Sequence, residues 1–315
     1  MNANPRQSTA AHPGQITRLR VCVLAMLGFC TLAAVPPAGR VLVLNSDTSI
    51  SRYLEVQDAF NASLATPAMT VDMAKEAPTE SALKRVLDRE NHATVYCIGA
   101  KAYQLASRVS KDRTIILSSA INWERFPARK QRHVIANELP AAVQLTLFRH
   151  FFPKLQRIGV LYNRDINRQW FEQAQAGAKE VGVELVGVNV RRSSEIAGVL
   201  RDLAPKVDAI WVTPDPVVLE TEASVRFLFE RCHTLQKPVF AYSPAFAELG
   251  ATLILAPDMP TIGRQAAAIV ADLASNPQPV HTPAGSEVTL NLARVKAYSL
   301  DLNRDALDSV NHLVK

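Results

Sequence analysis

Cysteine, long runs of charge and enzyme motifs are all scarce in this chain of 315 residues. Only four cysteines are present, and two of them fall within the N-terminal segment 1–38. The other two, Cys97 and Cys232, are far apart in sequence, and we expect them in different lobes. A disulfide between two moving lobes is not expected, so both are predicted to be small, buried thiols.

Catalytic signatures are missing as well. The sequence has no G-x-S-x-G elbow, no H-E-x-x-H, no phosphate-binding G-x-x-x-x-G-K-[ST] loop and no G-x-G-x-x-G. The seven histidines are scattered, with no two at metal-ligand spacing. The sequence therefore predicts a protein that is not an enzyme and that has no cofactor and no metal site.

The positively charged residues do not form a cluster in the sequence. The net charge is +6, but residues 1–38 hold three arginines and no acid, which leaves +3 for the rest of the chain. That charge is spread without long basic runs, so no nucleic-acid partner is expected.

The N-terminal segment has the pattern of a targeting signal. Arg18 and Arg20 precede the apolar run Val21–Val35, which has about the length of a signal-peptide core. Small residues at 33, 34 and 38 offer cleavage points. We therefore expect an exported, periplasmic protein, and an uncleaved leader would instead anchor it to the membrane. No second membrane segment is seen.

Apolar runs alternate with amphipathic segments along most of the chain. Between Arg157 and Pro214 the runs 157–163, 184–190 and 208–214 enclose helical patterns at 167–182 and 194–203. Continuous apolar strands between such helices indicate parallel strands covered on both faces. Residues 41–118 repeat the alternation. The predicted fold is α/β, with two doubly wound parallel-sheet lobes joined by a hinge.

The expected boundaries follow from this pattern. Residues 1–38 are a signal peptide or anchor plus a linker. Lobe 1 is 39–137 with a return segment at 252–276, which includes a helix from Thr261 to Leu273. Lobe 2 is 138–251 with a C-terminal segment at 280–315, which ends in a helix around Arg304 to Leu313.

Small ligands bind such sheets just beyond the carboxyl ends of the strands. In lobe 1, short hydroxyls and free backbone N–H groups at helix N-termini suit a carboxylate. The same residues are also ordinary helix caps, and both interpretations can hold for the group. The lobe 1 candidates for ligand binding are Ser46, Asp47, Ser49, Gly99, Ala100, Ser118, Ser119 and Asn122.

The corresponding positions of lobe 2 carry aromatic and polar side chains. Trp170 and Trp211, on a helix face and inside a strand, are predicted to be core residues instead. The lobe 2 candidates for ligand binding are Tyr162, Asn163, Thr213, Asp215, Tyr242 and Ser243.

Five patches within about the last 170 residues resemble one known family: Phe152–Asn163, Pro205–Asp215, Lys237–Ser243, Gly250–Ala267 and Leu290–Ala297. They are similar to the segments of ABC-transporter substrate-binding proteins of the tryptophan/tyrosine-binding type. That family has the type I periplasmic-binding fold. Residues before these patches match it in layout only.

The resemblance implies an exported solute-binding protein. It would capture a small-molecule ligand, such as an amino acid, between its lobes and present it to the transmembrane subunit of an ABC permease. In this family Asp215 would pair with a ligand amine, although its place between Pro214 and Pro216 is also that of a simple turn acid. The alternative is a membrane-anchored periplasmic sensor, or a non-transport interaction module of the same fold.

Overall fold

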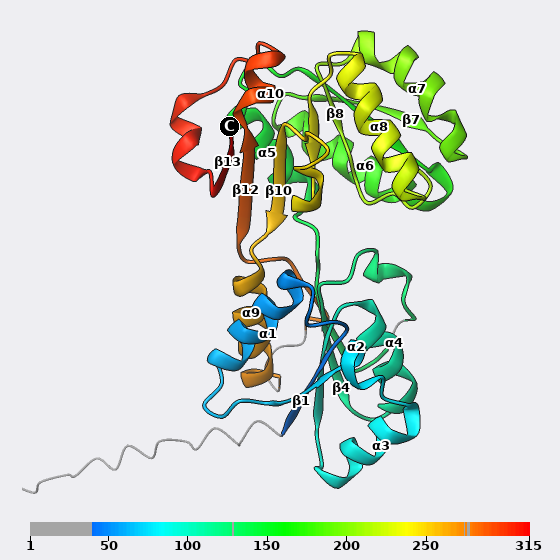
Figure 1. Cartoon of the computed structure of the whole chain (residues 1–315), viewed down its shortest axis with the longest axis vertical. Coiled ribbons are helices and arrows are strands. Elements are labelled where there is room, and N and C mark those ends of the chain that lie inside the picture. Colours follow the sequence, from blue (N-terminus) through cyan, green and yellow to red (C-terminus); the bar gives the residue numbers. More distant parts are fainter. Residues whose placement is uncertain (1–39, 128, 274, 276–277) are drawn as a thin grey trace, which may run out of the picture. The chain divides into compact units, whose positions relative to one another are not determined.

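The computed structural model describes residues 40–315 apart from 128, 274 and 276–277, and it contains two sheets (Figure 1). The predicted leader and its cleavage points lie outside the described residues. The first sheet is entirely parallel, and its six strands follow the order β11-β5-β4-β3-β1-β2. Their bounds are β1 Val41–Asn45, β2 Met69–Asp72, β3 Thr94–Ile98, β4 Thr114–Ser118, β5 Arg132–Ile135 and β11 Val280–His281.

The second sheet has seven strands in the order β13-β12-β10-β9-β8-β6-β7. All pairs are parallel except β10 with β12. Their bounds are β6 Arg157–Tyr162, β7 Glu184–Asn189, β8 Ala209–Trp211, β9 Val239–Ala241, β10 Leu253–Pro257, β12 Ser286–Asn291 and β13 His312–Val314. Two doubly wound lobes confirm the predicted fold class.

Helices cover both faces of each sheet. With the first sheet are α1 Ser51–Ala62, α2 Met73–Glu76, α3 Glu80–Arg89, α4 Ala100–Val109, the 3-10 turn η1 Trp123–Arg125 and α9 Met259–Ala271. With the second are α5 Ala141–Phe151, α6 Arg164–Glu180, α7 Ile196–Leu203, α8 Glu222–Thr234 and α10 Leu292–Ala297, with short 3-10 turns η2 Ser193–Glu195, η3 Ala204–Lys206, η4 Pro244–Phe246 and η5 Arg304–Ser309.

Strand alternation explains why two layers of helices are needed. In β1, Leu42 and Leu44 belong to the apolar cluster shared with α3 and α4, whereas Val43 belongs to the cluster shared with α1 and α9. Successive side chains of a strand point to opposite faces, so a fully apolar strand must be covered on both. The second sheet is likewise buried between two clusters.

The chain passes between the two sheets more often than the expected boundaries allow. Within the return segment 252–276, Leu253–Pro257 pairs with β9 and β12 of the second sheet, and only α9 packs with the first. Within 280–315, Val280–His281 pairs with β5 of the first sheet. Strand pairing, which the sequence pattern does not specify, therefore places part of the return segment in lobe 2 and part of the C-terminal segment in lobe 1.

The expected C-terminal helix at 304–313 is wrong. Residues Arg304–Ser309 form the 3-10 turn η5, and His312–Val314 then adds a parallel edge strand to β12. Asn311 directs this change, because its backbone N–H donates to the Val288 carbonyl and its side chain accepts from the Val288 N–H.

Two further expectations concern individual residues and membrane segments. Cys97 and Cys232 are both free and buried, as predicted. Among the described residues, no helix combines the length and apolar character needed to cross a membrane.

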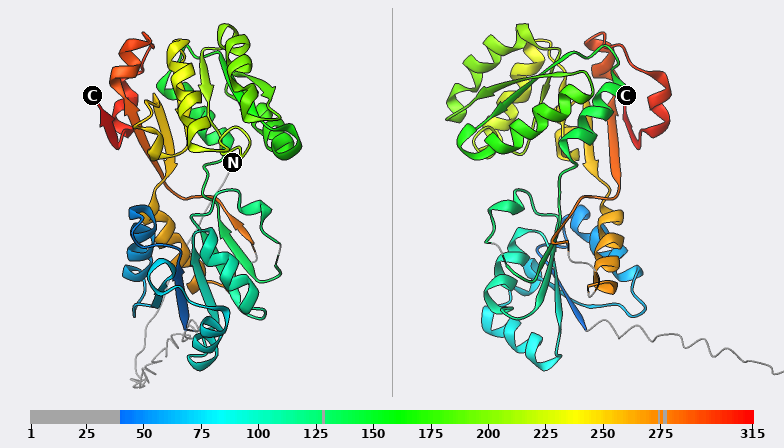
Figure 2. Two further views of the ribbon diagram at one scale, coloured as in Figure 1. Left: turned by 45° about the vertical axis from the view of Figure 1, so that its right-hand side comes forward. Right: turned by 180° about the vertical axis from the view of Figure 1, so that it is seen from behind.

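Helices α1 and α9, which are some 200 residues apart in the sequence, lie side by side in every view (Figures 1 and 2). Gly263 makes this close approach possible. A Cβ atom there would lie 2.3 Å from the Val56 carbonyl oxygen and 2.8 Å from the Phe60 nitrogen.

We therefore expect Gly263→Ala to destabilise the protein by about 1–3 kcal/mol, because the clash is with backbone atoms. Urea unfolding measures the change. The matched control is Gly198→Ala in α7, where the nearest atom is 4.0 Å away and where alanine should stabilise by roughly 0.5–1 kcal/mol. Equal stability of the two variants would contradict the close packing.

Candidate functional site

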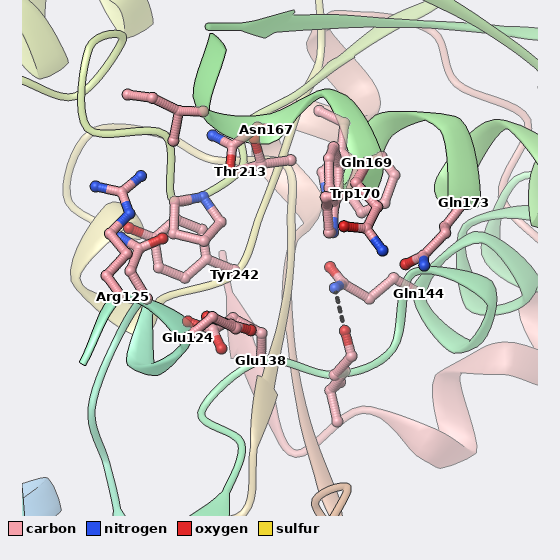
Figure 3. Close-up of a pocket in the computed structure, with 15 residues that line it drawn as sticks. Glu124, Arg125, Glu138, Gln144, Asn167, Gln169, Trp170, Gln173, Thr213 and Tyr242 are labelled. Atoms are coloured by element: carbon pink, nitrogen blue, oxygen red, sulfur yellow. Dashed lines mark hydrogen bonds between the residues drawn. The ribbon is translucent and has the colours of Figure 1, made fainter. Parts of the chain in front are cut away.

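A cavity of about 370 Å³ lies at the carboxyl ends of strands from both sheets. That volume is typical of a small-molecule site. Residues following β4, residues of the crossing segment before α5, one face of α6 and the ends of β8 and β9 all contribute (Figure 3). The lining residues are Asn122, Glu124, Arg125, Glu138, Leu139, Gln144, Ile166, Asn167, Gln169, Trp170, Gln173, Trp211, Thr213, Pro214 and Tyr242.

One wall of the cavity is aromatic and rigid. The rings of Trp170 and Trp211 meet edge to face with centroids 5.3 Å apart. Trp211 in turn contacts Phe148 of α5 at 5.5 Å, and Tyr242 meets Phe246 edge to face at 5.3 Å. Trp211 is buried in the apolar cluster of the second lobe, as predicted, whereas Trp170 is only partly buried and packs against that cluster. Their edges also face the cavity, and a flat apolar group would find ready-made partners here.

Two acceptors in the cavity have no partner. Gln144 donates its Nε2 to the Leu139 carbonyl at 2.8 Å (dashed line, Figure 3), which leaves its Oε1 buried and without a hydrogen bond among the described residues. The Oε1 atom of Glu138 is in the same state. Buried polar atoms are almost always paired, so these two acceptors are available to donors that a ligand or water brings.

Glu138 is also perturbed electrostatically. Burial, and then the nearby charge of Glu124, raises the pKa of the Glu138 carboxyl to about 7, while backbone groups of Asn122, Asn137 and Glu138 itself hold the shift back. Burial, followed by the charge of Glu138, raises the pKa of the Tyr242 phenol. Perturbed titratable groups in a cavity are typical of functional sites.

Comparison with known proteins identifies the family. The family model described as "ABC transporter substrate binding protein" matches residues 75–304. The chain belongs to this family. It is therefore a substrate-binding protein and not an enzyme.

Similar proteins agree with this assignment. A curated tyrosine-binding protein of Clostridioides difficile (strain R20291) is 21% identical over 251 residues, covering 76% of this chain and 71% of the relative. A Clostridium difficile substrate binding protein with adhesive properties, in its ligand-free, open form, has a TM-score of 0.68 at 17% identity. An ABC domain from Streptococcus pneumonia in complex with L-Trp has a TM-score of 0.58 at 18% identity. Both structures cover 88% of this chain, and 99% of each is covered.

Three of the residues proposed from the sequence line the cavity of this substrate-binding protein: Asn122, Thr213 and Tyr242. The other eleven do not.

In lobe 1, the remaining candidates make bonds within the chain. The Ser46 Oγ accepts from the Ala102 N–H at 3.0 Å, and Asp47 accepts from the N–H and the hydroxyl of Ser49 at 2.9 and 2.6 Å. Those bonds from Ser49 hold the pKa of Asp47 below its usual value. Asp47 and Ser49 thus form a turn before α1, whose N-cap residue is Ile50 and has no side-chain cap bond, so the expected capping of the following helix is not seen. Ser46 instead accepts from the first turn of α4.

The other lobe 1 candidates lie around the start of α4 and the end of β4. Gly99, at φ +88°, is the N-cap of α4, and a Cβ atom there would lie 2.6 Å from the Ser46 Oγ. Ala100 is the first residue of that helix. Ser118 shares a buried hydrogen bond of 2.8 Å with the Tyr96 hydroxyl, and Ser119 is buried outside the cavity lining.

In lobe 2, Tyr162 is buried and stacks on Phe171 with ring centroids 4.5 Å apart. Asn163 caps α6 by accepting from the Asp165 N–H at 3.1 Å, and it donates to the Val190 carbonyl at 2.9 Å. Ser243 is the N-cap residue of η4. None of the three lines the cavity.

Asp215 is completely buried, and its carboxylate is saturated by the chain. One oxygen accepts from the Asn163 N–H at 2.6 Å and from the Asn167 amide at 2.5 Å. The other accepts from the N–H groups of Val217 and Val218 at 2.9 and 3.1 Å. This pattern favours the turn interpretation of Asp215 over pairing with a ligand amine.

Several lining residues were not proposed from the sequence. Ile166, Gln169, Trp170 and Gln173 share one face of α6 at spacings of three and four, a pattern visible in the sequence once that face is known to be a wall. Glu124, Arg125, Glu138 and Gln144 carry no comparable local signal.

We expect Asp215→Ala to destabilise the unliganded protein by roughly 2–4 kcal/mol, because four donors lose a charged, buried acceptor. Urea unfolding without added ligand measures this loss. The exposed Asp308→Ala, in η5, is the control and should change stability by less than about 0.5 kcal/mol. A fully stable Asp215→Ala would instead restore the ligand-binding interpretation of this residue.

Glu138 should also make stability depend on pH. Its folded pKa, about 7, lies above the ordinary value of 4.5, so the folded state binds more protons than the unfolded state between these values, and stability falls as pH rises through them. Glu138→Gln removes the charge. It should match the wild type near pH 4.5 and exceed its free energy of unfolding at pH 8 by on the order of 1–3 kcal/mol.

Denaturant unfolding of both proteins at the two pH values checks this difference. The exposed Glu248→Gln serves as the control and should give the same difference from wild type at both. A pH-independent effect of Glu138→Gln would show that Glu138 is not desolvated in the unliganded protein.

Proposed function

We propose that this protein is an exported solute-binding protein that captures an amino acid with an aromatic side chain and delivers it to an ABC-type importer. The observation that carries the proposal is the combination, in one 370 Å³ cavity, of an aromatic wall and unpaired hydrogen-bond acceptors. The aromatic wall suits a flat side chain, and the acceptors suit an amine. The family assignment and the tyrosine-binding and L-Trp-bound relatives are consistent with this choice.

A ligand in this cavity would contact parts of the chain that belong to different sheets. Arg125 and Asn122 follow β4 of the first sheet, whereas Trp170 and Gln173 lie on α6 beside the second. A ligand that touches both groups at once stabilises the conformations in which they are close. Such a ligand-dependent equilibrium gives an importer a means to distinguish loaded from empty protein.

We expect the thermal midpoint of the full-length chain to rise when L-tryptophan or L-tyrosine is added. At a ligand concentration of about a hundred times the dissociation constant, the stabilisation is about 2.7 kcal/mol, which amounts to a few degrees for a protein of this size. Trp170→Ala should weaken binding about tenfold through loss of ring contact. Differential scanning fluorimetry with calorimetric titration measures both.

The exposed Phe227→Ala on α8 is the matched control and should bind as the wild type does. Folded protein that responds to neither amino acid, nor to L-phenylalanine, contradicts the aromatic amino-acid ligand.

A further inference from the structure

Among the acids at the cavity, only Glu138 is in a position to bind a positively charged ligand group away from water. Glu138 is partly buried on the segment that crosses between the lobes, and its Oε1 is without a partner among the described residues. Glu124 also lines the cavity, but its side chain is exposed. Asp215 is not a lining residue, and its oxygens are already occupied. Of the three acids, only Glu138 offers a free, desolvated oxygen.

A second acceptor without a partner, the Gln144 Oε1, lines the same cavity as Glu138, and so does the Arg125 guanidinium. The Gln144 amide has its nitrogen committed to Leu139 and its Oε1 free. Figure 3 shows the carboxyl groups of Glu124 and Glu138 together at one end of the cavity, with Tyr242 above them and Arg125 to one side. A ligand that completes this site must bring hydrogen-bond donors, and a positive charge would relieve the repulsion between the two carboxylates.

We propose that Glu138 anchors the ammonium group of the ligand, and that the site therefore selects primary amines with a flat apolar group over the matching carboxylic acids. This inference rests on the proposed function and specifies the chemistry of the same cavity. The Gln144 Oε1 accepts a second ammonium hydrogen, and the wall of Trp170 and Trp211 takes the flat group.

Binding of an amine at Glu138 is coupled to a proton. The unliganded carboxyl is largely protonated at pH 6, because its pKa is about 7, and an ammonium ion favours the ionised form. Loading near pH 6 therefore releases about one proton per ligand. The other titratable or charged groups in the lining are Glu124 and Arg125 from η1 and Tyr242 after β9. The lining residues of α6 are Ile166, Asn167, Gln169, Trp170 and Gln173, which do not titrate.

The test uses three probes that differ only in their charged groups: L-tryptophan, tryptamine and 3-indolepropionate. Calorimetric titration of the full-length wild type at pH 8 should show binding of L-tryptophan and tryptamine, with 3-indolepropionate at least tenfold weaker. Glu138→Gln should weaken the two amines by roughly ten- to a hundredfold and change the affinity for 3-indolepropionate by less than about threefold. Glu248→Gln, at an exposed position, should leave all three affinities unchanged.

The pH profile separates anchoring from a merely structural role. The wild-type affinity for tryptamine should fall by more than about tenfold from pH 7.5 to pH 5.5, and Glu138→Gln should abolish this slope. Titrations in buffers of different ionisation enthalpy count the released proton directly. Glu124→Gln should retain tryptamine binding at pH 8 and shift the profile to lower pH, because the charge of Glu124 helps to raise the pKa of Glu138.

The outcomes separate the inference from the proposed function. If the wild type and Glu138→Gln bind L-tryptophan equally tightly, Glu138 does not anchor the ammonium group. The proposal that the ligand is an aromatic amino acid is unaffected by that result. Wild-type protein that prefers 3-indolepropionate to tryptamine likewise overturns the selection for amines. Folded wild-type protein that binds none of the three probes, nor L-tyrosine, overturns both.

Discussion

The pocket wall depends on one buried carboxylate. Asp215 follows β8, and its oxygens accept from the end of β6 at Asn163, from α6 at Asn167 and from its own loop at Val217 and Val218. These bonds fix the first turn of α6 to the edge of the sheet. Trp170 and Gln173 are one and two turns further along that helix, so their place in the cavity follows from it. A buried charge is tolerated here because every donor around it is used.

The location of the site was predictable from the sequence, because it follows from strand order in a doubly wound sheet. The apolar runs at 157–162 and 209–211 and the helical spacing between them identify parallel strands, and parallel strands share one carboxyl edge. Thr213 and Tyr242, which line the cavity, were proposed in this way. Glu138 was not, because it belongs to a crossing segment whose position is set by β5, α5 and strands from the other end of the chain. The C-terminal strand 312–314 was also not predicted, because it depends on pairing with the distant strand β12.

Most of the short polar residues proposed at strand ends bond within the chain and do not line the cavity, for a physical reason. Serine, aspartate and asparagine side chains reach the backbone one to three residues away, and such local bonds cost little entropy. Asp47 and Asn163 make such local bonds, whereas Ser46 accepts from the distant Ala102 N–H in α4. The cavity is lined instead by longer side chains, such as Gln144, Gln173 and Arg125, which extend past the capped ends. Short side chains such as Asn122 and Thr213 also line the cavity, where they are joined by these longer ones.

The unpaired acceptors of the cavity oppose folding and favour binding for the same reason. Each buried polar atom without a partner costs about 1–3 kcal/mol, and a carboxylate costs more unless it takes up a proton. Glu138 takes up that proton near neutral pH, which limits its cost in the empty protein. In the proposed complex the ligand ammonium ion would replace the proton and form the stronger, charge-assisted bond. The edge-to-face contact of Trp211 with Phe148 helps to hold the Trp211 ring in the cavity wall.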